Sequence, residues 1–150
     1  MSDLKIELHK LCMAYVRKRM ETAAQAIDAA QQAANEETKS SAGDKYETGR
    51  AMMQQETDRN KAQLNEANKL MVALNHINTG TISKTVIPGS LVITNNGKFY
   101  MAISAGTLLL NEEAYFSVSP ASPIGLSLSG KSAGNEFTLN GKQYRVESIL

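Results

Sequence analysis

Two acidic residues, Asp44 and Glu47, have the chemistry and the spacing of a small functional site. They lie in the segment SSAGDKYETGR, residues 40–50, directly after the turn residue Gly43. A hard divalent cation such as Mg²⁺ usually takes one or two protein carboxylates and obtains its other ligands from water and phosphate. Two acids at an exposed turn could therefore complete a metal site that another macromolecule supplies, in a phosphoryl-transfer centre.

The same two acids also fit a purely structural role. Asp-x-x-Glu at the start of a helix has the spacing of a capping box, with Asp44 as N-cap and Glu47 at the third helical position. Three basic residues flank the pair, namely Lys39, Lys45 and Arg50. They could meet the phosphates of a nucleic acid, or they could be solvated surface charges. Capping and metal binding do not exclude each other.

No second group of reactive residues is evident in the sequence. The two histidines, His9 and His76, have no ligand spacing to each other or to a cysteine. We expect both to lie on the surface or near the base of a helical hairpin. The single cysteine, Cys12, lies in an apolar helical stretch, so we expect a buried and unreactive thiol.

The first 77 residues predict two long helices that fold against each other. They contain no proline and are rich in good helix formers. Apolar residues recur with steps of four and three, which is a heptad seam, at Val16, Met20, Ala23, Ile27, Ala30 and Ala34. A second seam contains Met53, Thr57, Asn60, Leu64, Ala67, Met71 and Leu74. Neither helix could bury its stripe alone, so the pattern predicts an antiparallel helical hairpin that turns in SSAGD.

From about residue 78 the sequence changes to strands and turns. The segments SLVIT, FYMAIS, TLLLN, AYFSVS, NEFTLN and QYRVESIL predict strands, and two Asn-Gly pairs predict hairpin turns. Between the fourth and fifth strands, Ser122 as N-cap, Pro123 and Gly130 delimit a short helix. We therefore expect an α+β fold: a helical hairpin over residues 1–80 with its tip at 40–48, then a small antiparallel β domain over 81–150.

Composition excludes several classes of function. The net charge is +1, with 12 basic and 11 acidic residues up to residue 84 and four of each from 85 onward, so no strongly basic nucleic-acid surface covers the molecule. Tryptophan is absent and aromatic residues make up 5%, which disfavours a broad base-stacking surface. No apolar run is long enough to cross a bilayer, and the N-terminus lacks the apolar core of a signal peptide. We expect a cytoplasmic monomer that does not engage a membrane.

Several stretches resemble the bacterial Gre transcript-cleavage factors. SPIGLSLSGKSAGNEF is similar to a conserved stretch of that family, with Ser122, Pro123, Ile124, Leu128, Gly130, Lys131 and Gly134 in register. VIPGSLV resembles the family's first strand and YRVESI its last. Gly43, Asp44 and Glu47 match the Gly-Asp-x-x-Glu of the family's hairpin tip. The resemblance covers nearly the whole chain and implies that the β domain is FKBP-like.

The resemblance also implies a function. It implies a transcription elongation factor that binds the secondary channel of bacterial RNA polymerase. Asp44 and Glu47 would help hold a Mg²⁺ ion shared with the polymerase, which then cleaves the RNA 3′ end of a backtracked complex. The protein would be an accessory factor with no active site and no cofactor of its own.

Other functions remain open from the sequence. The family usually follows its tip glutamate with Asn-Ala-Glu-Tyr, whereas this chain has Thr48, Gly49, Arg50 and Ala51. A regulator that occupies the same channel without stimulating cleavage is one alternative. Two others come from different classes, an FKBP-like prolyl isomerase or chaperone and a coiled-coil adaptor.

Overall fold

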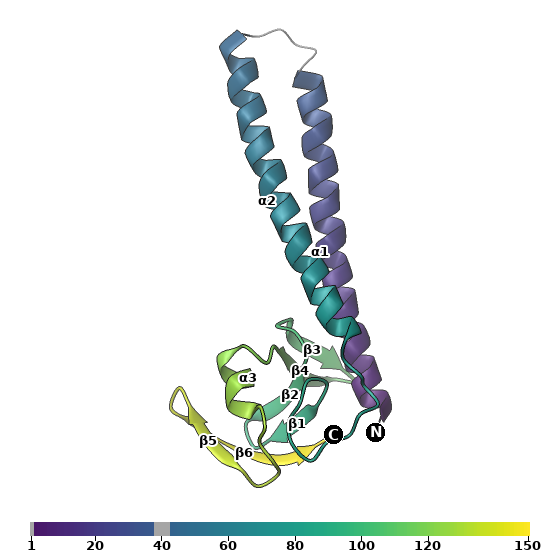
Figure 1. Ribbon diagram of the computed structural model, residues 1–150, viewed down its shortest axis with the longest axis vertical. Helices are drawn as coiled ribbons and strands as arrows, with labels where there is room; N and C mark the ends of the chain where they lie inside the picture. The colour runs from purple at the N-terminus through teal and green to yellow at the C-terminus, as the bar shows by residue number, and fades with distance from the viewer. Residues whose placement is uncertain (1, 38–42) are drawn as a thin grey trace. The chain divides into compact units, whose positions relative to one another are not determined.

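A computed structural model describes residues 2–37 and 43–150 of the chain, and the side chains of residues 2–3, 34, 36–37 and 43–48 are outside this description. Two long helices come first, α1 (Ser2–Glu37) and α2 (Gly43–Asn75). Six strands and a short helix follow: β1 (Leu91–Thr94), β2 (Gly97–Met101), β3 (Gly106–Leu110), β4 (Glu113–Val118), α3 (Pro123–Leu128), β5 (Glu136–Leu139) and β6 (Lys142–Ile149) (Figure 1). The predicted α+β fold is confirmed.

The chain packs as two compact units. Their boundaries are not at residue 80, where the sequence predicts the single boundary between hairpin and β domain. The hairpin unit consists of residues 16–70, and the sheet unit combines residues 1–15 with residues 71–150. The first four turns of α1 therefore belong with the sheet. The reason is non-local, because polar and apolar side chains of these turns contact strands far along the sequence.

The six strands form one sheet in the order β3-β4-β2-β1-β6-β5. Four of the neighbouring pairs are antiparallel, as predicted, but β2 and β4 are parallel, with Phe99 opposite Phe116. In the β3–β4 hairpin it is β4 that lies beside β2, and it runs in the same direction as β2. Strand β3 therefore lies at the edge of the sheet. A bulge interrupts the β1–β6 pairing between Ile93 and Thr94.

The hairpin turns follow the sequence signals in part. Asn140 and Gly141 both have positive φ, 51° and 80°, as the predicted Asn-Gly turn requires. In the first hairpin the loop is Asn95–Asn96, and Gly97 pairs with Thr94 instead of lying in the loop. The β3–β4 turn uses Asn111 and Glu112 at φ 52° and 67°. The sequence does not signal that turn, because Glu rarely adopts positive φ.

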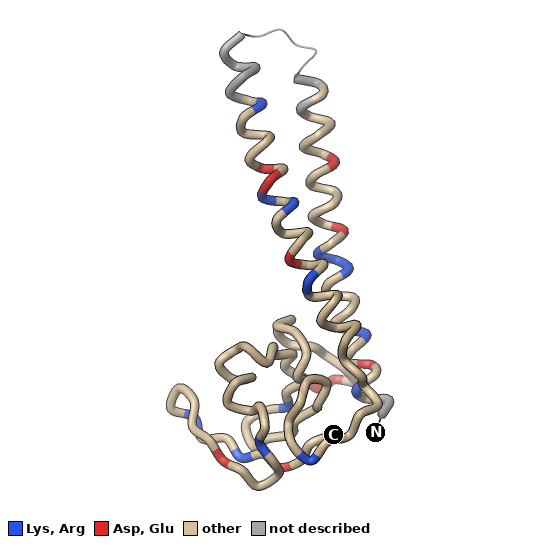
Figure 2. Tube along the Cα trace, viewed as in Figure 1, with Lys and Arg blue, Asp and Glu red and all other residues tan. Residues whose placement is uncertain are grey.

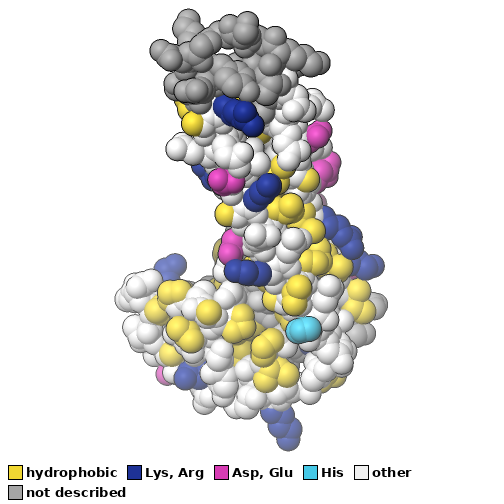
Figure 3. All heavy atoms as spheres, turned by 45° about the horizontal axis from the view of Figure 1, so that its top comes forward, with side chains coloured by type: hydrophobic (Ala, Val, Ile, Leu, Met, Phe, Trp, Pro, Cys, Tyr) yellow, Lys and Arg dark blue, Asp and Glu magenta, His cyan; other side chains and the backbone are white. Residues whose placement is uncertain are grey.

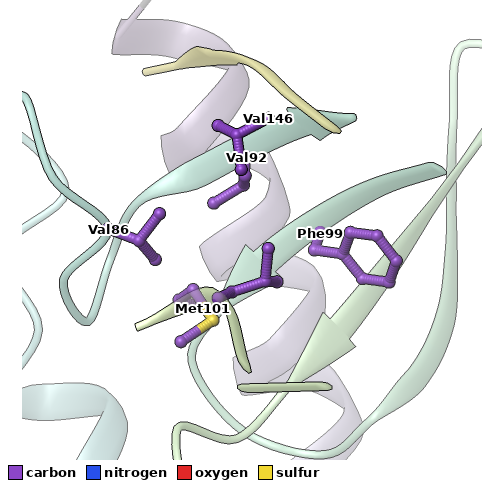
Figure 4. Close-up of a cluster of buried hydrophobic side chains, with 6 residues drawn as sticks. Val86, Val92, Phe99, Met101 and Val146 are labelled. Atoms are coloured by element: carbon purple, nitrogen blue, oxygen red, sulfur yellow. The ribbon is translucent and has the colours of Figure 1, made fainter. Parts of the chain in front are cut away.

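The two faces of the sheet are covered by different helices. On one face, Val86, Val92, Phe99, Met101, Leu128 and Val146 form a buried cluster (Figure 4). Leu128 comes from α3, whose N-cap Ser122 accepts a hydrogen bond from the Gly125 amide at 3.1 Å. A Cβ at Gly125 would collide with the Ser119 carbonyl oxygen, so glycine is required there. The other face carries Tyr100 and Ser117, which contact the start of α1.

Candidate functional site

The hairpin unit is held together by the two predicted heptad seams. Every seam position from Val16 to Ala30 and from Met53 to Ala67 is buried or half-buried, which confirms the seams over these residues. The buried positions are occupied mainly by small side chains, with Ala23 at 4%, Ala67 at 0% and Thr57 at 7% exposure. Small residues let two helices approach closely, so the two arms can pack against each other at these positions without large apolar side chains. Charged residues of both signs are distributed along both arms (Figure 2).

The predicted tip acids lie at the start of α2. This helix begins at Gly43, so Asp44 and Glu47 lie in its first two turns, and the capping interaction predicted for them lies outside the described residues. Residues three apart in a helix lie on the same side, so the backbone places Asp44 and Glu47 together next to the positive end of the helix dipole. The contacts of these two side chains lie outside the described residues.

The three predicted basic residues are described to different extents. Lys39 lies outside the described residues, and Lys45 lies in the first turn of α2 with its side chain outside the description. Arg50 is exposed, two turns into α2. The structure therefore places Asp44, Lys45, Glu47 and Arg50 on one helical end, without giving the geometry of a metal or phosphate site.

A small hollow lies between the two arms next to this end. Its volume is about 160 Å³, and it is lined by Ala30, Gln31, Arg50, Met53, Gln54, Thr57 and Lys61. Gln54 Nε2 donates a hydrogen bond to Asp58 Oδ1 at 3.0 Å. Among the described residues, the lining offers cations, amides and a hydroxyl but no carboxylate, so these side chains are not the donors that a Mg²⁺ ion prefers.

A row of polar side chains on α1 joins the start of this helix to the sheet. Lys5 Nζ donates to the Thr81 carbonyl oxygen at 2.8 Å. His9 Nδ1 and Tyr100 Oη are hydrogen-bonded at 2.9 Å, and Cys12 Sγ lies 3.3 Å from Ser117 Oγ. Sequence reasoning did not predict these pairs, whose partners lie in distant strands and loops.

Burial determines the ionisation of this row. It lowers the pKa of the Lys5 ammonium, and it lowers that of His9 against the opposing effect of a hydrogen bond with the Leu74 backbone. It raises the pKa of the Cys12 thiol, so this cysteine is buried and unreactive, as predicted. At each position burial shifts the pKa toward the neutral form, as expected for side chains that make structural contacts.

A second polar cluster lies on the sheet surface, and it was not predicted either. Lys98 Nζ is 2.7 Å from Glu113 Oε2, and Tyr115 Oη donates to the same oxygen at 2.9 Å. The hydrogen bond from Lys98 lowers the pKa of the Glu113 carboxyl. Residues 98 and 113 come together because β2 and β4 are neighbours, which no local sequence signal reveals.

The described residues contain neither a cluster of three potential metal ligands nor a helix that could cross a membrane. Within residues whose side chains are described, no three His, Cys, Asp or Glu residues are grouped so that they could hold a metal ion. Asp44 and Glu47 fall outside that search. No described helix is both long enough and apolar enough to cross a membrane.

Comparisons with known proteins give a distant structural similarity. No protein-family model matches the chain, and no curated protein matches it. Among solved structures, the chain is similar to the transcription factor Gfh1 at 18% identity and a TM-score of 0.35, over 94% of this chain and 92% of that one. A similarity of this size carries no argument about function.

Proposed function

We propose that this protein is a transcription elongation factor of the Gre kind. It binds the secondary channel of bacterial RNA polymerase in the cytoplasm and stimulates cleavage of the RNA 3′ end in backtracked complexes. The observation that carries the proposal is the helical hairpin whose second helix starts with Asp44 and Glu47 on one side. The Gre-like stretches SPIGLSLSGKSAGNEF and Gly-Asp-x-x-Glu add support from the sequence.

The chemistry of the tip suits an accessory role. Asp44 and Glu47 supply hard oxygen donors, and these are the ligands that Mg²⁺ prefers. Two carboxylates on an exposed helix end leave most of the coordination sphere to other ligands, so the polymerase would provide the remaining protein ligands. The ion, when bound there, would activate a water molecule for attack on a phosphodiester. The chain itself positions the two carboxylates and is not an enzyme.

A second candidate is a regulator that occupies the channel without stimulating cleavage. The residues that follow Glu47 favour it, because Arg50 replaces an acid at a family position. Arg50 is three residues after Glu47, a spacing that brings helical side chains together. A cation at this place would compete with Mg²⁺ for the glutamate.

Cleavage of radiolabelled RNA in a stalled, backtracked polymerase complex distinguishes the two candidates. The full chain is compared, in the presence of Mg²⁺, with the double variant Asp44→Ala/Glu47→Ala. The control is Glu56→Ala/Asp58→Ala, which removes two exposed acids from the same helix. We expect RNA shortening with the wild type and the control but not with the tip variant, while all three bind the polymerase.

The other outcomes are equally informative. Binding without shortening by the wild type would select the channel-occupying regulator. Loss of polymerase binding in the tip variant alone would mean that the two acids act in docking and not in metal chemistry. A wild type that neither binds nor promotes shortening would contradict both candidates.

A further inference from the structure

Strand β3 forms an open edge of the sheet. It pairs with β4 on one side, and the strand order places it at the end of the sheet. Residues 102–110, AISAGTLLL, contain no charge and no proline. Leu109 is 72% exposed, and the neighbouring Phe116 on β4 is 39% exposed. The sheet unit as seen in Figure 3 carries many hydrophobic and few charged side chains.

The hydrogen-bond pattern shows which backbone groups of β3 are free to pair. The loop Asn111–Glu112 has two residues, so the flanking Leu110 and Glu113 exchange hydrogen bonds across the turn. In an antiparallel ladder such pairs alternate with pairs that do not bond each other. The N–H and C=O groups of Thr107 and Leu109 therefore point away from β4, toward the open edge.

Strand β3 carries no lysine, no proline and no bulge along this edge. Natural edge strands are commonly protected by lysine, by proline or by a bulge. The pairing of β3 with β4 runs without a register shift over five residues, and none of these five is charged or proline. An extended, uncharged and partly apolar edge of this kind readily accepts another strand.

We propose that β3 pairs with β3 of a second copy of this chain, antiparallel about a two-fold axis through Leu108. In this register Thr107 of one copy lies opposite Leu109 of the partner subunit. These are the residues whose backbone groups point outward, so each such pair can exchange both of its hydrogen bonds. The two sheets become one continuous sheet, and the proposal does not depend on the proposed function.

The side chains and charges favour this occupant and this direction. Thr107 is paired with Phe116 on β4, so an apolar row would run from Phe116 across Thr107 to Leu109 of the partner subunit. The two copies of Leu109 would be diagonal neighbours, which can contact each other across a sheet. In this antiparallel register the acidic turn residues Glu112 and Glu113 face the uncharged residues 104 and 103 of the other copy. A parallel arrangement would bring the two acidic turns together.

The contact is small, and this determines how the dimer behaves. A stable protein interface buries about 1,600 Å², and one pair of five-residue strands covers less than that. We therefore expect reversible association that depends on protein concentration.

Analytical ultracentrifugation of the full chain between about 10 µM and about 1 mM tests the proposal, since this range covers weak association. Leu109→Lys places two lysines diagonally across the interface and should weaken association at least about tenfold. Leu126→Lys is the matched control, because Leu126 is 67% exposed on α3 and lies outside β3. It should associate like the wild type.

A second variant tests the backbone pairing directly. Thr107→Pro removes an N–H that points to the open edge and takes no part in the β3–β4 ladder, so the sheet should stay folded. Circular dichroism verifies the fold, and association should be lost. A wild type that remains monomeric over the whole range overturns the proposal. Association that survives both Leu109→Lys and Thr107→Pro overturns it as well.

Discussion

At the scale of single residues, the most informative side chains are the polar ones on the first turns of α1. Lys5, His9 and Cys12 share one side of the helix and each contacts a different part of the sheet unit. The Ser117 hydroxyl donates to the Ile103 carbonyl oxygen, so its lone pairs are left to accept the Cys12 thiol hydrogen. Each group of this row has a hydrogen-bond partner, and Lys5 and Cys12 are buried while His9 is half-buried. Breaking one of these hydrogen bonds should lower the stability of the folded chain, because a buried polar group without its partner is destabilising.

The titration of His9 gives a prediction about stability and pH. Burial lowers its pKa in the folded chain below the ordinary 6.5. The unfolded chain therefore binds a proton more readily, and the free energy of unfolding should fall as the pH drops from about 7 to about 5. His9→Asn removes the titration and keeps a polar group near Tyr100, so its urea unfolding should depend less on pH. His76→Asn, at an exposed histidine, should follow the wild type; equal pH dependence in all three proteins would exclude His9 as the source.

At the scale of elements, the two arms of the hairpin unit illustrate how small residues set helix spacing. Ala23 on α1 and Ala67 on α2 are almost fully buried, although alanine has little surface to bury. They are buried because the partner helix passes close by. The seam therefore depends on the close approach of the two helices at these positions.

A larger side chain in the seam should force the arms apart. Ala23→Leu inserts three carbons where the interior is already filled, at a cost of about 1–3 kcal/mol. Thermal unfolding followed by circular dichroism at 222 nm should show a lower midpoint for the hairpin. Ala24→Leu is the control, because Ala24 is exposed and leucine is also a good helix former. A seam variant as stable as this control would contradict the close packing.

At the scale of the whole molecule, the division into units does not follow the order of the chain. The sheet unit takes its first segment from residues 1–15 and the remainder from 71–150. Leu8 and Cys12 on α1 are fully buried, as are Leu91 and Tyr100 in the strands. The sheet consequently depends on a helix that precedes it by more than fifty residues.

Fragments of the chain test this dependence. A fragment of residues 77–150 should unfold at lower urea than the full chain, because the sheet face with Tyr100 and Ser117 loses its cover. A chain in which a short turn replaces residues 24–66 keeps all of the sheet unit and should retain its stability. Tyrosine fluorescence during urea unfolding compares the three. If the short fragment is as stable as the full chain, residues 1–15 are not part of the sheet's core.

Local patterns in the sequence determined much of the molecule. Steps of four and three placed the seams, alternation and turn residues placed six strands, and Ser122, Pro123 and Gly130 delimited α3. These signals succeed because they depend on residues a few positions apart. The tip site is also a product of the sequence, since Asp44 and Glu47 are grouped by their spacing alone.

Only the tertiary structure decided which elements meet. The parallel pairing of β2 with β4, the edge position of β3 and the β3–β4 turn at Asn111–Glu112 had no local signal. The partners of Lys5, His9 and Cys12 lie 76, 91 and 105 residues away. Contacts over such distances depend on the order of the strands in the whole sheet. Lys5, His9 and Cys12 can therefore form their hydrogen bonds only when the sheet unit is folded.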